Sequence, residues 1–196
     1  ARLLSSHRVR HGAQEFTPES FDSEHFAISP AEANAMDPQQ RRLLEGGYSA
    51  LQMSGSSKST LNGSGTGVAL GIYATEYAQL LLQSPVGYSV YASLNTLSVA
   101  GGRTSFALGL EGPCASFETA CSSSLVALHT AARALQHAEC SMHLAAGINL
   151  MLLPTAALGM AIAGMTSDVG RCHPFDNRDD GFARGEGCSA VILTPR

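Results

Sequence analysis

The sequence predicts an α/β fold whose sheet is covered on both faces, and three observations support this. Strand-like and helix-like segments alternate along the 196 residues, which is the order of an α/β protein. The strand-like segments are apolar throughout instead of alternating, as strands buried on both faces are. Residues 59–138 carry so little charge that their own fold or a partner must cover them; the charged residues there are Glu76, Arg103, Glu111, Glu118 and Arg133.

The N-terminal part is expected to hold two capped helices. The first begins at Ser29-Pro30, where Ser caps, Pro takes the first helical position and Glu32 closes a capping box. The second begins at Asp37-Pro38 and runs beyond Gly46-Gly47, a pair that predicts either close packing or a weak point. Residues 1–28 are expected to be irregular, with three aromatic anchors: Phe16, Phe21 and Phe26.

The remaining elements follow from apolar runs and turn residues. Residues 54–67 are expected to form a flexible loop, because their lysine and glycines lack the context of a phosphate loop or a dinucleotide fingerprint. The uncharged stretch 140–167 is long enough to cross a bilayer, but Asn149, Pro154 and several glycines interrupt it. It predicts a buried strand, a loop and a short buried helix, and no membrane span. Strands are predicted at 68–73, 115–119, 142–149 and 188–194, and helices at 75–82, 93–108 and 122–137.

The composition excludes several classes of protein. The formal net charge is −4 and eleven of the twelve basic residues are Arg, which argues against nucleic acid as a partner. Only 14% of residues are charged, against about 25% in an average domain, so disorder is not expected either. Five cysteines without a signal peptide fit a reducing cytoplasm better than a disulfide framework. Cys140–His143 and Cys172–His173 lack partner pairs at zinc-site spacing, so no metal is expected.

The segment Glu118-Thr-Ala-Cys-Ser-Ser-Ser-Leu-Val-Ala-Leu-His129 carries the chemistry. A short strand runs into Cys121 and a helix follows without a break, so Cys121 is expected on a sharp strand-to-helix turn. The unpaired N–H groups and the dipole at the helix start favour a thiolate there and can hold an oxyanion. Cys121 is therefore the candidate nucleophile, in a sulfur version of the nucleophile elbow.

A structural role for Cys121 as a small buried hydrophobic residue is the alternative on spacing alone. The other four cysteines lack the setting of Cys121, and for them the structural interpretation is preferred. His129 lies eight residues further along the helix, about 12 Å of rise away, whereas a general base must approach within ~3 Å. We therefore expect His129 in the core or in a supporting position, and the sequence singles out no other histidine as the base.

This segment resembles the active-site signature of the β-ketoacyl synthase (ketosynthase) domains of type I polyketide synthases and related fatty acid synthases. Three further stretches are similar to that family in the same order. They are Phe26-Ala-Ile-Ser-Pro30 through Met36-Asp-Pro-Gln-Gln-Arg41, Gly147-Ile-Asn-Leu-Met151 through Ala163-Gly-Met165, and Gly170-Arg-Cys-His-Pro-Phe-Asp176 with Asp180-Gly-Phe-Ala-Arg-Gly-Glu-Gly187. The family usually has Asp at the position of Glu118 and Asn at the position of Gly102.

The resemblance implies a thiolase-like fold of αβαβα layers, of which the chain covers about one of two pseudo-repeated halves. Residues 1–196 would be the N-terminal, nucleophile-bearing part, with the first strand and the C-terminal half missing. The implied chemistry is acyl transfer to Cys121, then decarboxylative Claisen condensation with a malonyl-type extender. The substrates would arrive on the phosphopantetheine of an acyl carrier protein, with no cofactor bound directly.

The resemblance also implies partners: the carrier protein, the remaining synthase domains, and a second copy bound through the charge-poor middle of the chain. The catalytic histidines and lysine of the family lie in its second half, so we expect the isolated chain to be inactive in condensation. A non-catalytic remnant or partner subunit is the alternative function. Retention of Cys121 favours the enzyme, because partner subunits of this family typically lose that cysteine. A thiolase shares the fold but fits the signature less well.

Overall fold

The computed structural model describes residues 2–4, 21–73, 76–83 and 90–195. One mixed sheet runs through it in the order β1-β5-β4-β2-β3. β2 (Thr66–Ile72) is parallel to both β3 (Cys114–Phe117) and β4 (Met142–Asn149). β5 (Gly187–Thr194) runs antiparallel to β4, and β1 (Arg2–Leu4) antiparallel to β5. The predicted α/β class is confirmed, and the predicted strands agree with β2 to β5 within two residues at each end.

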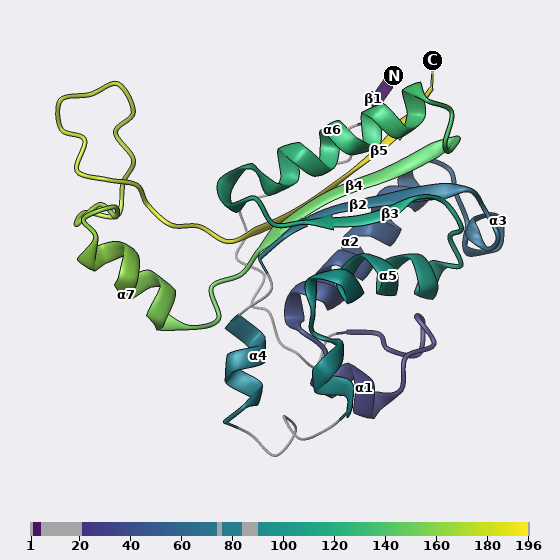
Figure 1. The fold of residues 1–196 in the computed structure, drawn as a ribbon, viewed down its shortest axis with the longest axis horizontal. Helices are drawn as coiled ribbons and strands as arrows, with labels where there is room; N and C mark the ends of the chain where they lie inside the picture. Colours follow the sequence, from purple (N-terminus) through teal and green to yellow (C-terminus); the bar gives the residue numbers. More distant parts are fainter. Residues whose placement is uncertain (1, 5–20, 74–75, 84–89, 196) are drawn as a thin grey trace.

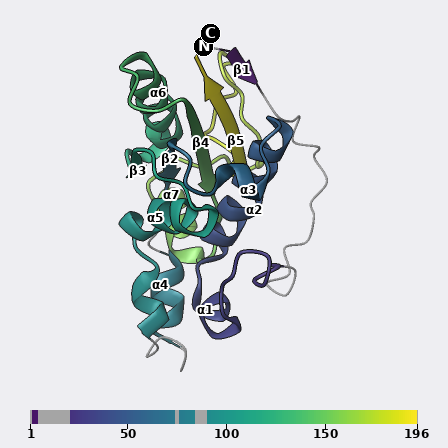
Figure 2. The ribbon, with the colours of Figure 1, turned by 90° about the vertical axis from the view of Figure 1, so that its right-hand side faces the viewer.

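Helices cover both faces of the sheet, as Figures 1 and 2 show. α2 (Pro38–Met53) and α5 (Leu97–Leu108) pack on one face, and α6 (Ser123–Gln136) packs on the other. The side chains of β2 alternate between the two cores: Val68, Leu70 and Ile72 face α2 and α5, whereas Ala69 faces α6. The shorter elements are α1 (Pro30–Ala35), α3 (Lys58–Leu61), α4 (Glu76–Leu81), η3 (Val90–Leu94), η4 (Ala120–Ser122) and α7 (Pro154–Ile162).

The helix starts follow the sequence pattern, with one difference. The Ser29 hydroxyl accepts a hydrogen bond from the Glu32 N–H, and the Asp37 carboxylate accepts one from the Gln39 N–H. The Glu32 side chain does not close the expected capping box. It forms an ion pair with Arg103 of α5 instead, because a distant guanidinium offers a stronger partner than a backbone N–H.

The glycine pair in α2 marks close packing, one of the two outcomes predicted for it. A methyl group at Gly47 would lie 3.0 Å from Leu144 Cδ2, and one at Gly46 would lie 3.6 Å from Cys188 Sγ. α2 stays continuous through both residues. The absence of side chains therefore lets α2 approach β4 and β5 closely, and the packing offsets the low helix propensity of glycine.

Several expectations for irregular segments need correction. Residues 2–4 form β1, although an irregular structure is expected for 1–28, and α3 interrupts the predicted 54–67 loop. A capping box between Ser57 and Thr60 starts α3. The predicted helix 93–108 is divided into η3 and α5. Phe21 and Phe26 stack with their ring centroids 5.5 Å apart, and Phe16 lies outside the described residues.

The predicted buried helix after β4 is wrong in its burial. α7 occupies the predicted place, but none of its residues is buried. α7 and the following loop form an arm, residues 154–186, that extends away from the sheet in Figure 1. The apolar composition of α7 predicts burial, but apolar side chains along the whole arm are exposed: Leu158, Ile162, Met165, Val169 and Phe175.

Candidate active site

Cys121 lies in the turn that joins β3 to α6. β3 ends at Phe117, a single 3-10 turn covers Ala120–Ser122, and α6 begins at Ser123. Ala120 adopts φ +52°, in the left-handed region that residues with a side chain rarely enter. The predicted sharp turn is therefore present, and Cys121 is exposed at the start of a helix. It is not the small buried residue of the structural alternative.

Two serines hold the backbone of this turn. The buried Ser123 hydroxyl donates to the Ala120 carbonyl at 2.7 Å and accepts from the Thr119 N–H at 2.8 Å. The Ser122 hydroxyl donates to the Thr119 carbonyl at 2.8 Å. These bonds reach the peptide groups on both sides of Ala120 and so stabilise its unusual conformation. The sequence indicates the small size of these neighbours of Cys121 but not that their hydroxyl groups fix the turn.

Two strand glycines let the first turn of α6 lie directly on the sheet. A methyl group at Gly71 would fall 2.5 Å from the carbonyl carbon of Ser123, and one at Gly147 would fall 2.6 Å from the Cβ of Ser124. Gly71 is the register partner of Gly147 on β4 and of Phe117 on β3. The Cys121 turn therefore lies at the carboxyl ends of three parallel strands, where α/β proteins commonly bind ligands.

The other cysteines lie in different surroundings. Burial raises the pKa of Cys188 to about 11 and also raises the pKa of Cys140. Cys172 is exposed in the arm, where its sulfur accepts a hydrogen bond from the Ala183 N–H at 3.1 Å. Cys114 is exposed on β3. All five are free thiols, and Cys121 alone lies at the N-terminal end of a helix.

None of the described histidines completes a catalytic pair with Cys121. His129 is exposed on α6, which excludes the core, one of its two expected positions. The face of α6 that meets the sheet consists of Ala127, Ala131 and Leu135. His143 is buried in β4, where desolvation lowers its pKa. Within the described residues, no hydrogen bond joins a histidine ring to the Cys121 thiol.

A buried polar network beside the site is a feature that sequence reasoning missed. The Gln39 amide donates to the carbonyl of Tyr73 at 2.8 Å and accepts from the N–H of Leu150 at 3.2 Å. Gln39 of α2 thereby joins the residues that follow β2 and β4. The Asp37 carboxylate orients Gln39 by accepting a hydrogen bond from the Gln39 side-chain amide. Burial raises the pKa of Asp37. From sequence, the stretch Met36–Arg41 indicates only a helix start and a family resemblance.

A second part of this network connects α5 and η3 to α2. Arg103 Nε donates to Gln40 Oε1 at 2.7 Å, and Asn95 accepts from the Asp37 N–H and donates to the Ala35 carbonyl, both at 2.7 Å. These residues are buried. Because these hydrogen bonds join residues of different elements, the network fixes the positions of the helices that pack near the carboxyl edge of the sheet.

Two cavities lie outside the Cys121 turn. A cavity of about 220 Å³ begins at Ser124, the second residue of α6, and is bounded by Gly147 of β4 and Val191 of β5. A larger cavity of about 410 Å³ lies on the arm. The described residues contain no cluster of three or more metal-ligating side chains. In that same part of the chain, no helix combines the length and apolar character needed to cross a membrane.

Similarity to known proteins identifies the family. Residues 2–196 match the family described as the N-terminal domain of β-ketoacyl synthase. The chain belongs to this family. This ketosynthase chain is 44% identical over 181 residues to a phenolphthiocerol/phthiocerol polyketide synthase chain of Mycobacterium tuberculosis. It is 43% identical over 182 residues to a mycocerosic acid synthase-like polyketide synthase of Mycolicibacterium smegmatis.

Solved ketosynthases share its fold. The ketosynthase from module 6 of the bacillaene synthase of Bacillus subtilis 168 matches with a TM-score of 0.80 and 40% identity, over 91% of this chain and 30% of that one. The oxazolomycin ketosynthase domain of Streptomyces albus matches with a TM-score of 0.83 and 33% identity, over 92% of this chain and 32% of that one. The thiolase-like fold implied by the resemblance is thereby confirmed.

The chain spans a small part of these relatives. The match covers 91% of this chain but 12% of the phenolphthiocerol/phthiocerol synthase chain, and 90% of this chain but 8% of the mycocerosic acid synthase-like protein. The relatives are polyketide synthases and the solved neighbours are ketosynthase domains. Membership of this acyltransferase-type enzyme family favours the enzymatic interpretation of the sequence over the non-catalytic alternative.

Proposed function

We propose that the chain is the nucleophile-bearing part of a β-ketoacyl synthase of polyketide biosynthesis, with Cys121 as the acyl acceptor. The observation that carries this proposal is the exposed thiol on the turn between β3 and α6, held by Ser123. The first turn of a helix presents backbone N–H groups without intrahelical partners, which can stabilise an oxyanion. The burial of Cys140 and Cys188 speaks against those two thiols as acceptors.

In the proposed loading step, the Cys121 thiolate attacks the thioester carbonyl of an acyl chain carried on phosphopantetheine. Backbone N–H groups of the turn, that of Cys121 included, stabilise the oxyanion. The C–S bond to the carrier breaks, the pantetheine sulfur takes up a proton, and the acyl group remains on Cys121. In the following condensation, the carbanion formed by decarboxylation of a malonyl-type extender attacks the acyl carbonyl and releases the Cys121 thiolate.

The proposal includes partners and a location. An acyl carrier protein would present both substrates, and the remaining synthase domains would supply and process them. A second copy of the chain would bind through residues 59–138, where β3 forms the last strand of the described sheet and Phe106 is 91% exposed. Five free thiols suit a reducing cytoplasm.

Acyl loading is the direct test. The chain is incubated with an acyl carrier thioester, and the modified residue is found by peptide mass spectrometry. We expect the adduct on Cys121, its loss in Cys121→Ala, and full loading in the matched variant Cys114→Ala, which removes another exposed thiol. Adducts that persist in Cys121→Ala at Cys114 or Cys172 would contradict the proposed site.

Addition of a malonyl carrier to the loaded chain tests the second step. We expect no β-ketoacyl product from the isolated chain. Decarboxylation in the family needs two histidines, and no described histidine is joined to Cys121 by a hydrogen bond. Efficient product formation, detected by mass spectrometry, would show that the chain contains the whole catalytic apparatus and refute this part of the proposal.

A further inference from the structure

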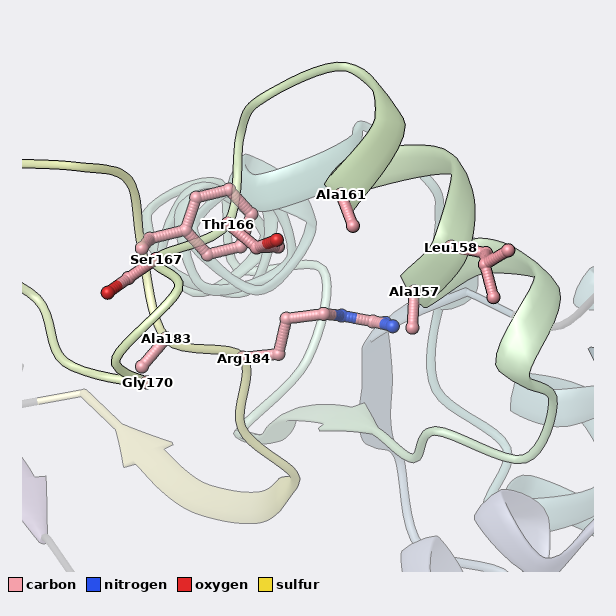
Figure 3. Close-up of a pocket in the computed structure, with 9 residues that line it drawn as sticks. Ala157, Leu158, Ala161, Thr166, Ser167, Gly170, Ala183 and Arg184 are labelled. Carbon is pink, nitrogen blue, oxygen red and sulfur yellow. The ribbon is translucent and has the colours of Figure 1, made fainter.

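The larger cavity has an asymmetric lining. With about 410 Å³ it falls within the size range of small-molecule sites. One wall is the apolar side of α7, formed by Ala157, Leu158 and Ala161, and the opposite wall is the returning loop of the arm. Figure 3 shows the Arg184 side chain extending from this loop toward Ala157. The other lining residues are Thr166, Ser167, Gly170, Phe182 and Ala183.

Arg184 brings an unpaired cationic group to this cavity. Its Nη1 atom is buried and, among the described residues, has no hydrogen-bond partner. None of the ion pairs found in that part of the chain includes Arg184. A buried guanidinium nitrogen without an acceptor costs free energy. Arg184 also lines the cavity, so a ligand that supplies an acceptor would give its guanidinium group a partner.

The loop that carries Arg184 is held in place before any ligand binds. The Phe182 N–H donates to the Met165 carbonyl at 3.0 Å, and the Phe182 carbonyl accepts from the Ser167 N–H at 3.1 Å. The Ser167 hydroxyl group points away from Arg184 in Figure 3. It hydrogen-bonds to Asp180, whose pKa it lowers. A preorganised wall lowers the entropy cost of binding.

We propose that this cavity binds a small monocarboxylate with a short aliphatic chain, at a site that does not include Cys121. The carboxylate would accept hydrogen bonds from the Arg184 guanidinium, a geometry that such pairs favour. The aliphatic part would lie against Ala157, Leu158 and Ala161. One unpaired cation in a mainly apolar lining matches one negative charge, whereas a phosphate dianion would need further donors to offset its desolvation.

Titration of the complete chain with butyrate tests the proposal, with backbone amide shifts of Gly170 and Ala183 followed by NMR. We expect saturable shifts for butyrate and none for butyramide, which has the same shape without the charge. Arg184→Gln should weaken butyrate binding about tenfold or more. The matched variant Arg178→Gln removes the same charge from an exposed position of the arm and should leave the affinity unchanged.

A second variant tests the apolar wall of the cavity without changing its charge. Ala161→Leu fills the apolar wall without removing Arg184 and should also weaken butyrate binding, by severalfold. Equal binding of butyrate in the original chain, Arg184→Gln and Ala161→Leu would overturn the proposal. Phosphate shifts at the same concentrations as butyrate, with the same dependence on Arg184, would overturn the assignment to a carboxylate.

Discussion

At the scale of single residues, Cys188 and Cys121 lie in contrasting surroundings. Cys188 packs against Gly46 of α2, and burial raises its pKa from the ordinary 9.0 to about 11. Its thiol stays neutral over most of the accessible pH range. Because the folded state keeps this proton longer than the unfolded state, the stability that the neutral thiol contributes is complete below pH 9 and is lost as the pH rises through 11.

Alkylation by iodoacetamide should follow these differences. At pH 8 we expect exposed Cys121 to react early and Cys188 last, because burial keeps the Cys188 thiol protonated and the thiolate is the reacting species. The Cys188 rate should rise about tenfold per pH unit until the pH reaches its pKa of about 11. Peptide mapping after timed quenching measures both rates, and Cys188→Ser serves as the control for the assignment. Reaction of Cys188 at the rate of Cys114 at pH 8 would contradict its burial.

The residue scale also shows the limit of what sequence could predict about the site. The placement of Cys121 followed from an apolar strand, a small-residue turn and a helix pattern in direct succession. The bonds of Ser123 could not be predicted, because they depend on the φ of Ala120, which a local pattern does not specify. The role of Gln39 needs strand ends that are 34 and 111 residues away, and no local spacing indicates such a contact.

At the scale of elements, the position of α6 depends on the absence of side chains at the sheet. Gly71 and Gly147 are register partners on β2 and β4, and both lie under the first turn of α6. Ala69 and Ala145 continue this small surface toward the middle of the helix. The approach places the Cys121 turn close to the carboxyl edge of the sheet, so a change at Gly71 should affect both stability and loading.

Gly71→Ala is therefore expected to destabilise the chain by about 1–3 kcal/mol through overpacking and to slow acyl loading of Cys121. The new methyl group would meet backbone atoms of Ser123 and Ser124, which cannot move without shifting α6. Gly187→Ala on β5 is the matched control, since a methyl group there meets nothing within 4 Å. Urea unfolding and loading rates give the comparison; equal stability of the two variants would contradict the packing argument.

At the scale of the whole molecule, the exposed apolar residues indicate which predictions needed information beyond local sequence. The alternation of elements was sufficient for the α/β class and for two covered faces. It was not sufficient for α7, whose apolar residues resemble those of a core helix but project from the arm. The local sequence shows how many apolar residues a segment has and how they are spaced. Only the tertiary arrangement decides what covers them.

Association in solution is expected to depend on the charge-poor segment 59–138. Phe106 is 91% exposed on α5, which packs against β3. Phe106→Asp should shift a dimer toward monomer in sedimentation velocity, because it places a charge in a surface that lacks charge. Ile162→Asp, at an exposed apolar position of the arm, is the control outside the segment. Dissociation by Ile162→Asp but not by Phe106→Asp would locate the contact elsewhere.

The buried carboxylate of Glu76 connects α4 to the beginning of the arm. One oxygen of Glu76 accepts the N–H groups of both Leu152 and Leu153, at 2.7 and 2.8 Å, just before α7 begins. These two amides can exchange their hydrogens with solvent only when their hydrogen bonds to Glu76 break. Local opening of α4 is therefore expected to deprotect the start of the arm in the same event, which would couple two segments that are far apart in sequence.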